Sequence, residues 1–133
     1  MTQEYKELLL KDLCARLPYE VKFMCNKNIY TTKGLDLIVA DDGDWKYAVT
    51  AKDIAPIEID FIKPYLFPLS SMTEEQKMFL KQQNWYIAMS TSGTVETTVE
   101  GIDWLNKNHF DYRGLIEREL AIDATNLNIY LVK

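Results

Sequence analysis

The hydrophobic pattern of the chain changes from helical to extended spacing at one residue, Pro18. After Pro18, apolar side chains alternate with polar ones from Tyr19 to Cys25, as in a half-buried strand. Because proline cannot continue a helix, the chain must leave its first helix here. We therefore expect an α+β fold whose N-terminal helix is capped by Thr2. The apolar residues with helical spacing before the proline are Tyr5, Leu8, Leu9, Leu13 and Leu17.

Short extended segments continue to about residue 62 and predict a small antiparallel sheet. Turn residues separate them, with the strongest turn signal at 41–44, Asp-Asp-Gly-Asp. A closed, SH3-like barrel is one way to complete such a sheet. Pro64 and Pro68 make residues 63–71 an extended connector in this interpretation. The predicted strands are 19–25, 29–32, 35–40, 45–49 and 57–61.

The second half of the chain is predicted to be mainly helical. Thr73 and Gln76 form a capping box before a helix over residues 74–83. Thr98 is expected to cap a helix to residue 108, and Asp111 a last helix to Leu120. Residues 121–133 are expected to form a β-hairpin, and 84–97 are ambiguous, with a strand at 85–89 as one interpretation. We expect one domain over 1–133, with helix and sheet in 1–72 and the mainly helical part and terminal hairpin in 73–133.

Composition narrows the possible partners and the compartment. Among 133 residues, 15 Lys and Arg face 20 Asp and Glu, so the net charge is −5. A negative charge disfavours nucleic acid and anionic membrane surfaces as partners. No basic, apolar leader opens the chain and no stretch is long enough to span a bilayer, so a cytoplasmic protein is expected. Cys14 and Cys25 are expected to be reduced and buried.

Three stretches carry a resemblance to a known family: 8–19 (LLLKDLCARLPY), 62–75 (IKPYLFPLSSMTEE) and 103–117 (DWLNKNHFDYRGLIE). Together they resemble a family of short uncharacterised proteins of gut Bacteroidales, which often lie in phage-like or mobile-element regions. The resemblance implies no particular activity. In that family a glycine commonly occupies the positions of Glu20 and Glu119. The first difference is expected to extend the following strand, and the second removes a stop signal from the predicted last helix.

His109 is the only histidine and the main candidate for catalysis. It lies two residues before Asp111, and a histidine oriented by a carboxylate can shuttle protons. The stronger interpretation is structural: His109 caps a carbonyl in a turn and Asp111 caps the next helix. A nucleophile would have to come from Cys14 or Cys25, and no spacing brings either close. No metal-ligand spacing or phosphate-cradling glycine loop occurs, so we predict no metal and no cofactor.

Aromatic residues give the main hint of a binding surface. Rings are enriched where proteins meet, although these four can equally close the core. Two helices followed by a hairpin also have the order of a winged helix, with 111–120 in the DNA groove, but Glu117 and Glu119 offset its arginines. The four rings are Trp45, Tyr47, Trp85 and Tyr86. The further candidate binding residues, near the C-terminal unit, are His109, Tyr112 and Arg113.

Three function classes follow from these patterns. The first is a non-enzymatic protein-interaction module or accessory factor of a phage-like or mobile element, binding a partner protein or its own copies. The second is a nucleic-acid-associated regulator with a winged-helix-like C-terminal unit, which predicts a local cluster of basic residues. The third is a small enzyme that uses His109. Two structural expectations accompany them: Asp12 and Arg16 form a surface ion pair, and Gly114 packs closely under Trp104 or Tyr65.

Overall fold

A computed structural model describes residues 2–85, 87–89 and 95–130. Helix α1 (Gln3–Arg16) begins where the Thr2 hydroxyl accepts a hydrogen bond from the Tyr5 backbone N–H, as predicted. A 3-10 turn, Leu17–Tyr19, carries Pro18 and ends at Glu20 in the left-handed conformation (φ 53°, ψ 51°). Glu20 therefore does not extend the next strand, and that expectation was wrong. A left-handed residue reverses the chain direction between α1 and the sheet.

The main sheet is open, so the SH3-like barrel is not supported. Its hydrogen-bonded order is β4-β3-β2-β1-β5-β8, with β9 also paired to β5, and in the part of the chain that the structure describes no pairing closes the path. The β1, β2, β3 and β4 strands pair antiparallel, whereas β8 and β9 run parallel to β5. The strands are β1 (Lys22–Cys25), β2 (Asn28–Val39), β3 (Trp45–Ala51), β4 (Ile57–Glu58), β5 (Lys63–Pro68), β8 (Phe110–Asp111) and β9 (Ile122–Asp123).

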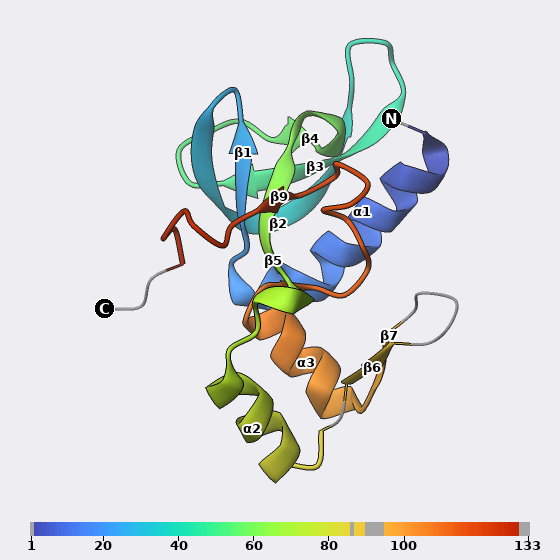
Figure 1. Cartoon of the computed structure of the whole chain (residues 1–133). Helices are drawn as coiled ribbons and strands as arrows, with labels where there is room; N and C mark the ends of the chain where they lie inside the picture. Colours follow the sequence, from blue (N-terminus) through green and yellow to red (C-terminus); the bar gives the residue numbers. More distant parts are fainter. Residues whose placement is uncertain (1, 86, 90–94, 131–133) are drawn as a thin grey trace.

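Strand β5 is the largest difference from the sequence prediction within the first half. Its two prolines suggested a connector, but the strand pairs with β1, Phe23 opposite Pro64. Proline lacks an N–H and therefore weakens a ladder at its own position only. The neighbouring Tyr65 and Leu66 are buried and anchor the strand. As a result β5 joins the antiparallel part of the sheet to the parallel pair β8 and β9 (Figure 1).

One apolar core lies between α1 and the sheet. Leu9 and Leu13 of α1 are completely buried, as the helical spacing predicted, and pack with Phe23 of β1 and Leu66 of β5. Figure 1 shows α1 lying across the sheet, with the β2–β3 hairpin projecting past it at the top. Cys25 belongs to this core, but Cys14 is exposed, so its predicted burial was wrong; both cysteines are free.

The helical half forms the lower part of the molecule in Figure 1. Helix α2 (Glu74–Gln82) starts with the predicted capping box of Thr73 and Gln76. Strands β6 (Ile87–Met89) and β7 (Val95–Thr97) pair antiparallel, and α3 (Val99–Lys107) follows with Thr98 as its cap. The end of the predicted strand at 85–89 is therefore seen, while Tyr86 and residues 90–94 lie outside the described part of the chain.

The predicted helix from Asp111 to Leu120 is absent, and turns replace it. Asp111 does cap the segment: its carboxylate accepts backbone N–H groups of Arg113, Leu115 and Ile116. Gly114, at φ 73°, then takes a left-handed conformation that no α-helix contains. Leu115 and Leu120 are nevertheless buried, because the compact loop packs them against the core without a helix.

The C-terminal hairpin is seen only in part. Its first strand corresponds to β9, which pairs in parallel with β5 at Tyr65 and Leu66. Ile129 and Tyr130 form a turn, and residues 131–133 lie outside the described part of the chain. A search of the described helices finds none long and apolar enough to cross a membrane.

Candidate functional site

The outer half of the β2–β3 hairpin presents an apolar face to solvent. Two directly opposed residue pairs make this face: Leu37 opposite Tyr47, and Val39 opposite Trp45. The side chains are 47%, 48%, 56% and 66% exposed in that order. We call these four residues the hairpin face. Isolated apolar side chains on a surface are ordinary, but four on two adjacent cross-strand pairs form a patch.

The hairpin face continues the core-facing side of the two strands. Residues two apart on a strand point to the same side, so the pair Leu35 and Val49 lies on this side too. Val49 is completely buried and Leu35 packs against the core. The alternation of apolar residues along β2 and β3 thus continues past the point where the core ends. For Trp45 and Tyr47 the interpretation as core residues was wrong.

The same hairpin is acidic and has free edges. Residues 35–47 contain Asp36, Asp41, Asp42 and Asp44 against Lys46 alone, a net charge of 1 − 4 = −3. Within the described ranges, β1 pairs only with residues 28–31 of β2, and β4 only with Ala48 and Val49 of β3. No described strand therefore pairs with the outer edges of the hairpin face, which leaves room for another strand, although the Leu37 N–H donates locally to the Asp36 carboxylate at 3.1 Å.

Trp85 lies elsewhere, so the predicted four-ring patch does not form as one surface. Trp85 follows α2, which lies at the end of the molecule opposite the hairpin (Figure 1). Its partly buried ring meets Phe79 edge-on at 5.8 Å between ring centroids. It also lines a largely apolar hollow of about 710 Å³ with Leu80 and Ile87. Tyr86 lies outside the described residues.

Trp85 begins a series of aromatic rings that joins the helical half to the sheet. Successive centroids lie between 3.9 and 6.3 Å apart along the series. Such pairs add about 0.5–1.5 kcal/mol each beyond burial. The rings therefore pack the two halves of the chain together. In order they are Trp85, Phe79, Trp104, Phe110, Phe67, Tyr130 and His109.

His109 is positioned by the end of α3. It follows the C-cap residue Asn108 with φ 62°, and its backbone N–H bonds to the carbonyl of Asn106, as expected of a left-handed helix stop. We had expected the His109 side chain to cap a carbonyl, but its ring stacks on Tyr130. The Nδ1 atom is buried without a hydrogen-bond partner among the described residues.

Burial lowers the pKa of His109 to about 4, with Arg16 and Lys22 adding to the shift. The imidazole is therefore neutral at pH 7, and a base with so low a pKa is poorly matched to proton transfer there. His109 lines a depression together with Glu20, but the Glu20 carboxylate is paired with Lys33 at 2.8 Å. Neither cysteine is among the lining residues of this depression. The enzyme alternative therefore gains little support from this geometry.

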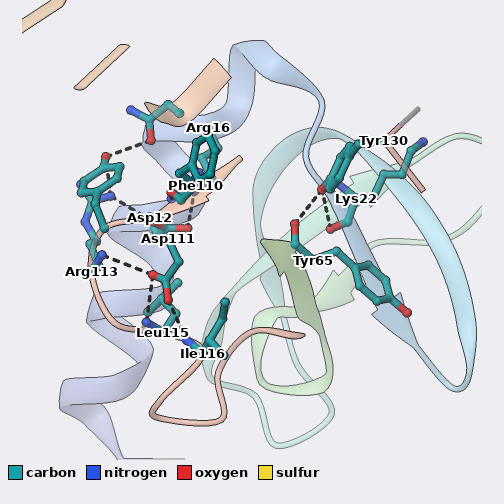
Figure 2. Close-up of polar contacts among 12 residues, drawn as sticks. Asp12, Arg16, Lys22, Tyr65, Phe110, Asp111, Arg113, Leu115, Ile116 and Tyr130 are labelled. Carbon is teal, nitrogen blue, oxygen red and sulfur yellow. Dashed lines mark hydrogen bonds and ion pairs between the residues drawn. The ribbon is translucent and has the colours of Figure 1, made fainter. Parts of the chain in front are cut away.

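Tyr130 bridges two strands at the point where their ladder opens. Its hydroxyl accepts the Lys22 backbone N–H at 2.6 Å and donates to the Tyr65 carbonyl at 2.8 Å, as Figure 2 shows. The β1–β5 register, with Phe23 opposite Pro64, would place these two residues opposite each other next. Burial raises the pKa of the Tyr130 phenol, so it stays a donor. Nothing in the sequence distinguished this tyrosine from an ordinary strand residue.

Tyr112 and Arg113 are partly buried and belong to an ionic network. Figure 2 shows Arg113 within this network. Arg113 donates to Asp12 at 3.0 Å and to the Tyr112 hydroxyl at 2.7 Å. Asp12 also accepts Arg16 at 2.8 Å, and both of these side chains are completely buried. The expectation of a surface pair at Asp12 and Arg16 was therefore wrong. Helical spacing predicted their contact, while only packing decided their burial.

The network ties α1 to the loop after β8. Arg16 donates a second hydrogen bond to the carbonyl of Phe110, and the Tyr112 hydroxyl donates to Asn106 of α3 at 2.9 Å. The guanidinium of Arg113 also lies 4.6 Å from the Tyr112 ring centroid. The carboxylate of Asp12 and most donors of the network are engaged within it, with Arg16 Nη1 alone of its atoms buried without a partner among the described residues. We therefore assign the network a structural role.

The hairpin face is thus the candidate site that combines exposed apolar side chains with strand edges that no described strand covers. In the described ranges no group of three or more His, Cys, Asp or Glu side chains is placed to hold a metal ion. Comparisons with protein-family models, with curated proteins and with solved structures found no match.

Proposed function

We propose that this protein is a non-enzymatic binding module that docks through the hairpin face onto a partner protein with an apolar strip flanked by Lys or Arg. The observation that carries the proposal is the exposure of Trp45 and Tyr47, at 66% and 48%, on a hairpin that projects beyond the core. A partner that covers them gains burial of large rings, which dominate many interfaces.

The acidic charge of the hairpin supports the choice of a basic partner. Asp41, Asp42 and Asp44 lie at the hairpin turn, next to the hairpin face. Opposite charge across an interface speeds encounter and suppresses wrong partners, whereas like charges repel. Two copies of the chain joined by their hairpins would bring together two segments of net charge −3 each. The charge therefore favours a different protein over self-association.

The free edges of β2 and β3 suggest how the partner binds. An extended segment can pair its backbone with either strand while its side chains cover Leu37, Val39, Trp45 and Tyr47. Such a module fits an accessory factor that recruits another protein. The resemblance to proteins from phage-like and mobile-element regions agrees with this role, which remains part of the proposal.

Site-specific photo-cross-linking in the native host tests the proposal. A benzoylphenylalanine probe replaces Tyr47 in one strain and Val99, the 76% exposed first residue of α3, in a control strain. We expect the Tyr47 probe to capture a protein whose cross-linked segment is apolar with Lys or Arg neighbours. The Asp41→Lys and Asp42→Lys double variant should reduce the capture, because it reverses the local charge.

Three outcomes contradict the proposal. Equal capture by the Tyr47 and Val99 probes would remove the special role of the hairpin face. Capture of a second copy of the chain alone would replace the basic partner with a homodimer. Capture that the Asp41→Lys and Asp42→Lys variant leaves unchanged would refute charge complementarity. Urea unfolding of each variant first establishes that it is folded.

A further inference from the structure

A second candidate site lies near the opposite end of β2 from the hairpin face. It is a depression of about 590 Å³, within the range of about 300–1,000 Å³ typical of small-ligand sites. Residues from β1, from the start of β2, from the end of β3 and from the C-terminal segment line it. We call it the lysine depression, after Lys22, Lys33 and Lys52 in its lining.

The lysine depression is positively charged within an acidic protein. Glu20 is the only acid in its described lining, so the lining carries 3 − 1 = +2, while the whole chain carries −5. The remaining residues thus sum to −5 − 2 = −7. Glu20 pairs with Lys33 at 2.8 Å and Lys22 donates to Thr31, while Lys52 is exposed. An anion would meet ammonium groups here and repulsion elsewhere on the surface.

Aromatic side chains provide the other part of the lining. The stacked pair His109 and Tyr130 lines the depression together with Tyr30 and Tyr19. The buried Nδ1 of His109 has no partner among the described residues, whereas a buried polar atom is usually hydrogen-bonded. A ligand with a planar, polar ring can stack on such side chains and offer donors and acceptors.

We propose that the lysine depression binds a small phosphomonoester that carries a planar ring, of the nucleoside monophosphate class. The phosphate would be held by Lys33 and Lys52, and the ring would lie against the aromatic lining. The charge distribution favours a small ligand over a nucleic-acid strand, because a strand would extend from the +2 depression across a surface of net charge −7.

Isothermal titration calorimetry at low salt with adenosine 5′-monophosphate, adenosine and inorganic phosphate tests the proposal. We expect saturable binding of the monophosphate, weaker binding of phosphate and the weakest binding of adenosine. Lys52→Ala should weaken monophosphate binding by about two- to fivefold, the size of one exposed charge pair. Glu20→Gln should strengthen it, because it removes the only negative charge in the described lining.

A matched control is Lys11→Ala, which removes an exposed lysine on α1, outside the depression. The proposal is overturned if the monophosphate does not bind saturably or if adenosine binds as tightly as the monophosphate. It also fails if Lys52→Ala behaves like Lys11→Ala. Tighter binding of a short single-stranded oligonucleotide than of the monophosphate would overturn the assignment to a small ligand.

Discussion

The imidazole ring of His109 stacks on the phenol ring of Tyr130, with ring centroids 3.9 Å apart and planes inclined by 19°. His109 ends α3, and Tyr130 lies in the turn after β9, so the stack joins two parts of the chain. The Tyr130 hydroxyl is in turn bonded to β1 and β5. This relationship connects the helical half, the C-terminal segment and the sheet, and predictions about stability follow from it.

Tyr130→Phe should keep the ring stack but remove the bridge between β1 and β5. The Lys22 N–H and the Tyr65 carbonyl would lose their hydroxyl partner. An unsatisfied buried polar group costs about 1–3 kcal/mol, and we expect a loss of that size in the free energy of unfolding by urea. Tyr47→Phe is the control, since Tyr47 is exposed and the change should stay within about 0.5 kcal/mol. Equal effects of the two variants would contradict the bridge.

Stability should fall between pH 6.5 and pH 4 because of His109. Its folded pKa is lowered to about 4 from 6.5, first by burial and then by Arg16 and Lys22. Below pH 6.5 the unfolded chain binds a proton that the folded chain does not bind, so acid favours unfolding. The contribution reaches about 1–3 kcal/mol at pH 4, after allowance for partial exposure.

The control for this pH dependence is His109→Asn, which removes the titrating group and tolerates the positive φ of this position. We expect the variant to show a shallower loss of unfolding free energy between pH 6.5 and pH 4, measured by urea titration at several pH values. Identical slopes for the two proteins would refute the assignment to His109.

Arg16→Ala should be strongly destabilising. The change leaves the buried carboxylate of Asp12 with Arg113 alone and removes the donor to the Phe110 carbonyl. Breaking a buried ion pair costs about 3–5 kcal/mol. Arg16→Lys should recover only part of this loss, because an ammonium cannot reproduce the two-sided guanidinium contact. Thermal and urea unfolding measure both, with the exposed Lys107→Ala as control. A loss below about 1 kcal/mol in Arg16→Ala would contradict this account.

Gly114→Ala and Glu119→Gly should change stability in opposite directions. Gly114 has φ 73° and Glu119 φ 60°, a region that costs an L-residue about 1–2 kcal/mol. An added Cβ at Gly114 would also meet the Arg118 guanidinium, which is a flexible neighbour. We expect a loss of about 1–2 kcal/mol in Gly114→Ala and a gain of up to about 1 kcal/mol in Glu119→Gly. Equal signs in urea unfolding would refute the role of φ.

The reason for Gly114 differs from the sequence-based prediction. We expected close packing under Trp104 or Tyr65, whereas the nearest atoms to an added Cβ belong to Arg118. The positive φ explains the glycine instead. Positive φ also occurs at Glu20 and Glu119. We had expected Glu20 to extend the next strand and Glu119 to leave the last helix without a stop signal, whereas both residues take the left-handed conformation in turns.

The candidate site was predictable only in part. Trp45 and Tyr47 were identified by residue type, but their exposure depends on where the core ends along β3. We grouped Trp85 with them because a sequence does not show how far apart in space two segments lie that are 40 residues apart along the chain. The role of Tyr130 depends on the ladder between β1 and β5, which pairs residues more than 35 positions apart. Such long-range relationships leave no local pattern.

The local elements could be identified from the amino-acid sequence: Thr2, Thr73 and Thr98 cap the three α-helices of the described ranges, and alternation marks β1 and β3. Caps and periodicity act within a few residues, so they can be identified from the chain alone. Tertiary structure decided that Arg16 is buried, that Pro64 lies in a paired strand and that residues 112–120 form turns. Those outcomes depend on which distant groups meet, because burial and backbone pairing are completed by partners far along the chain.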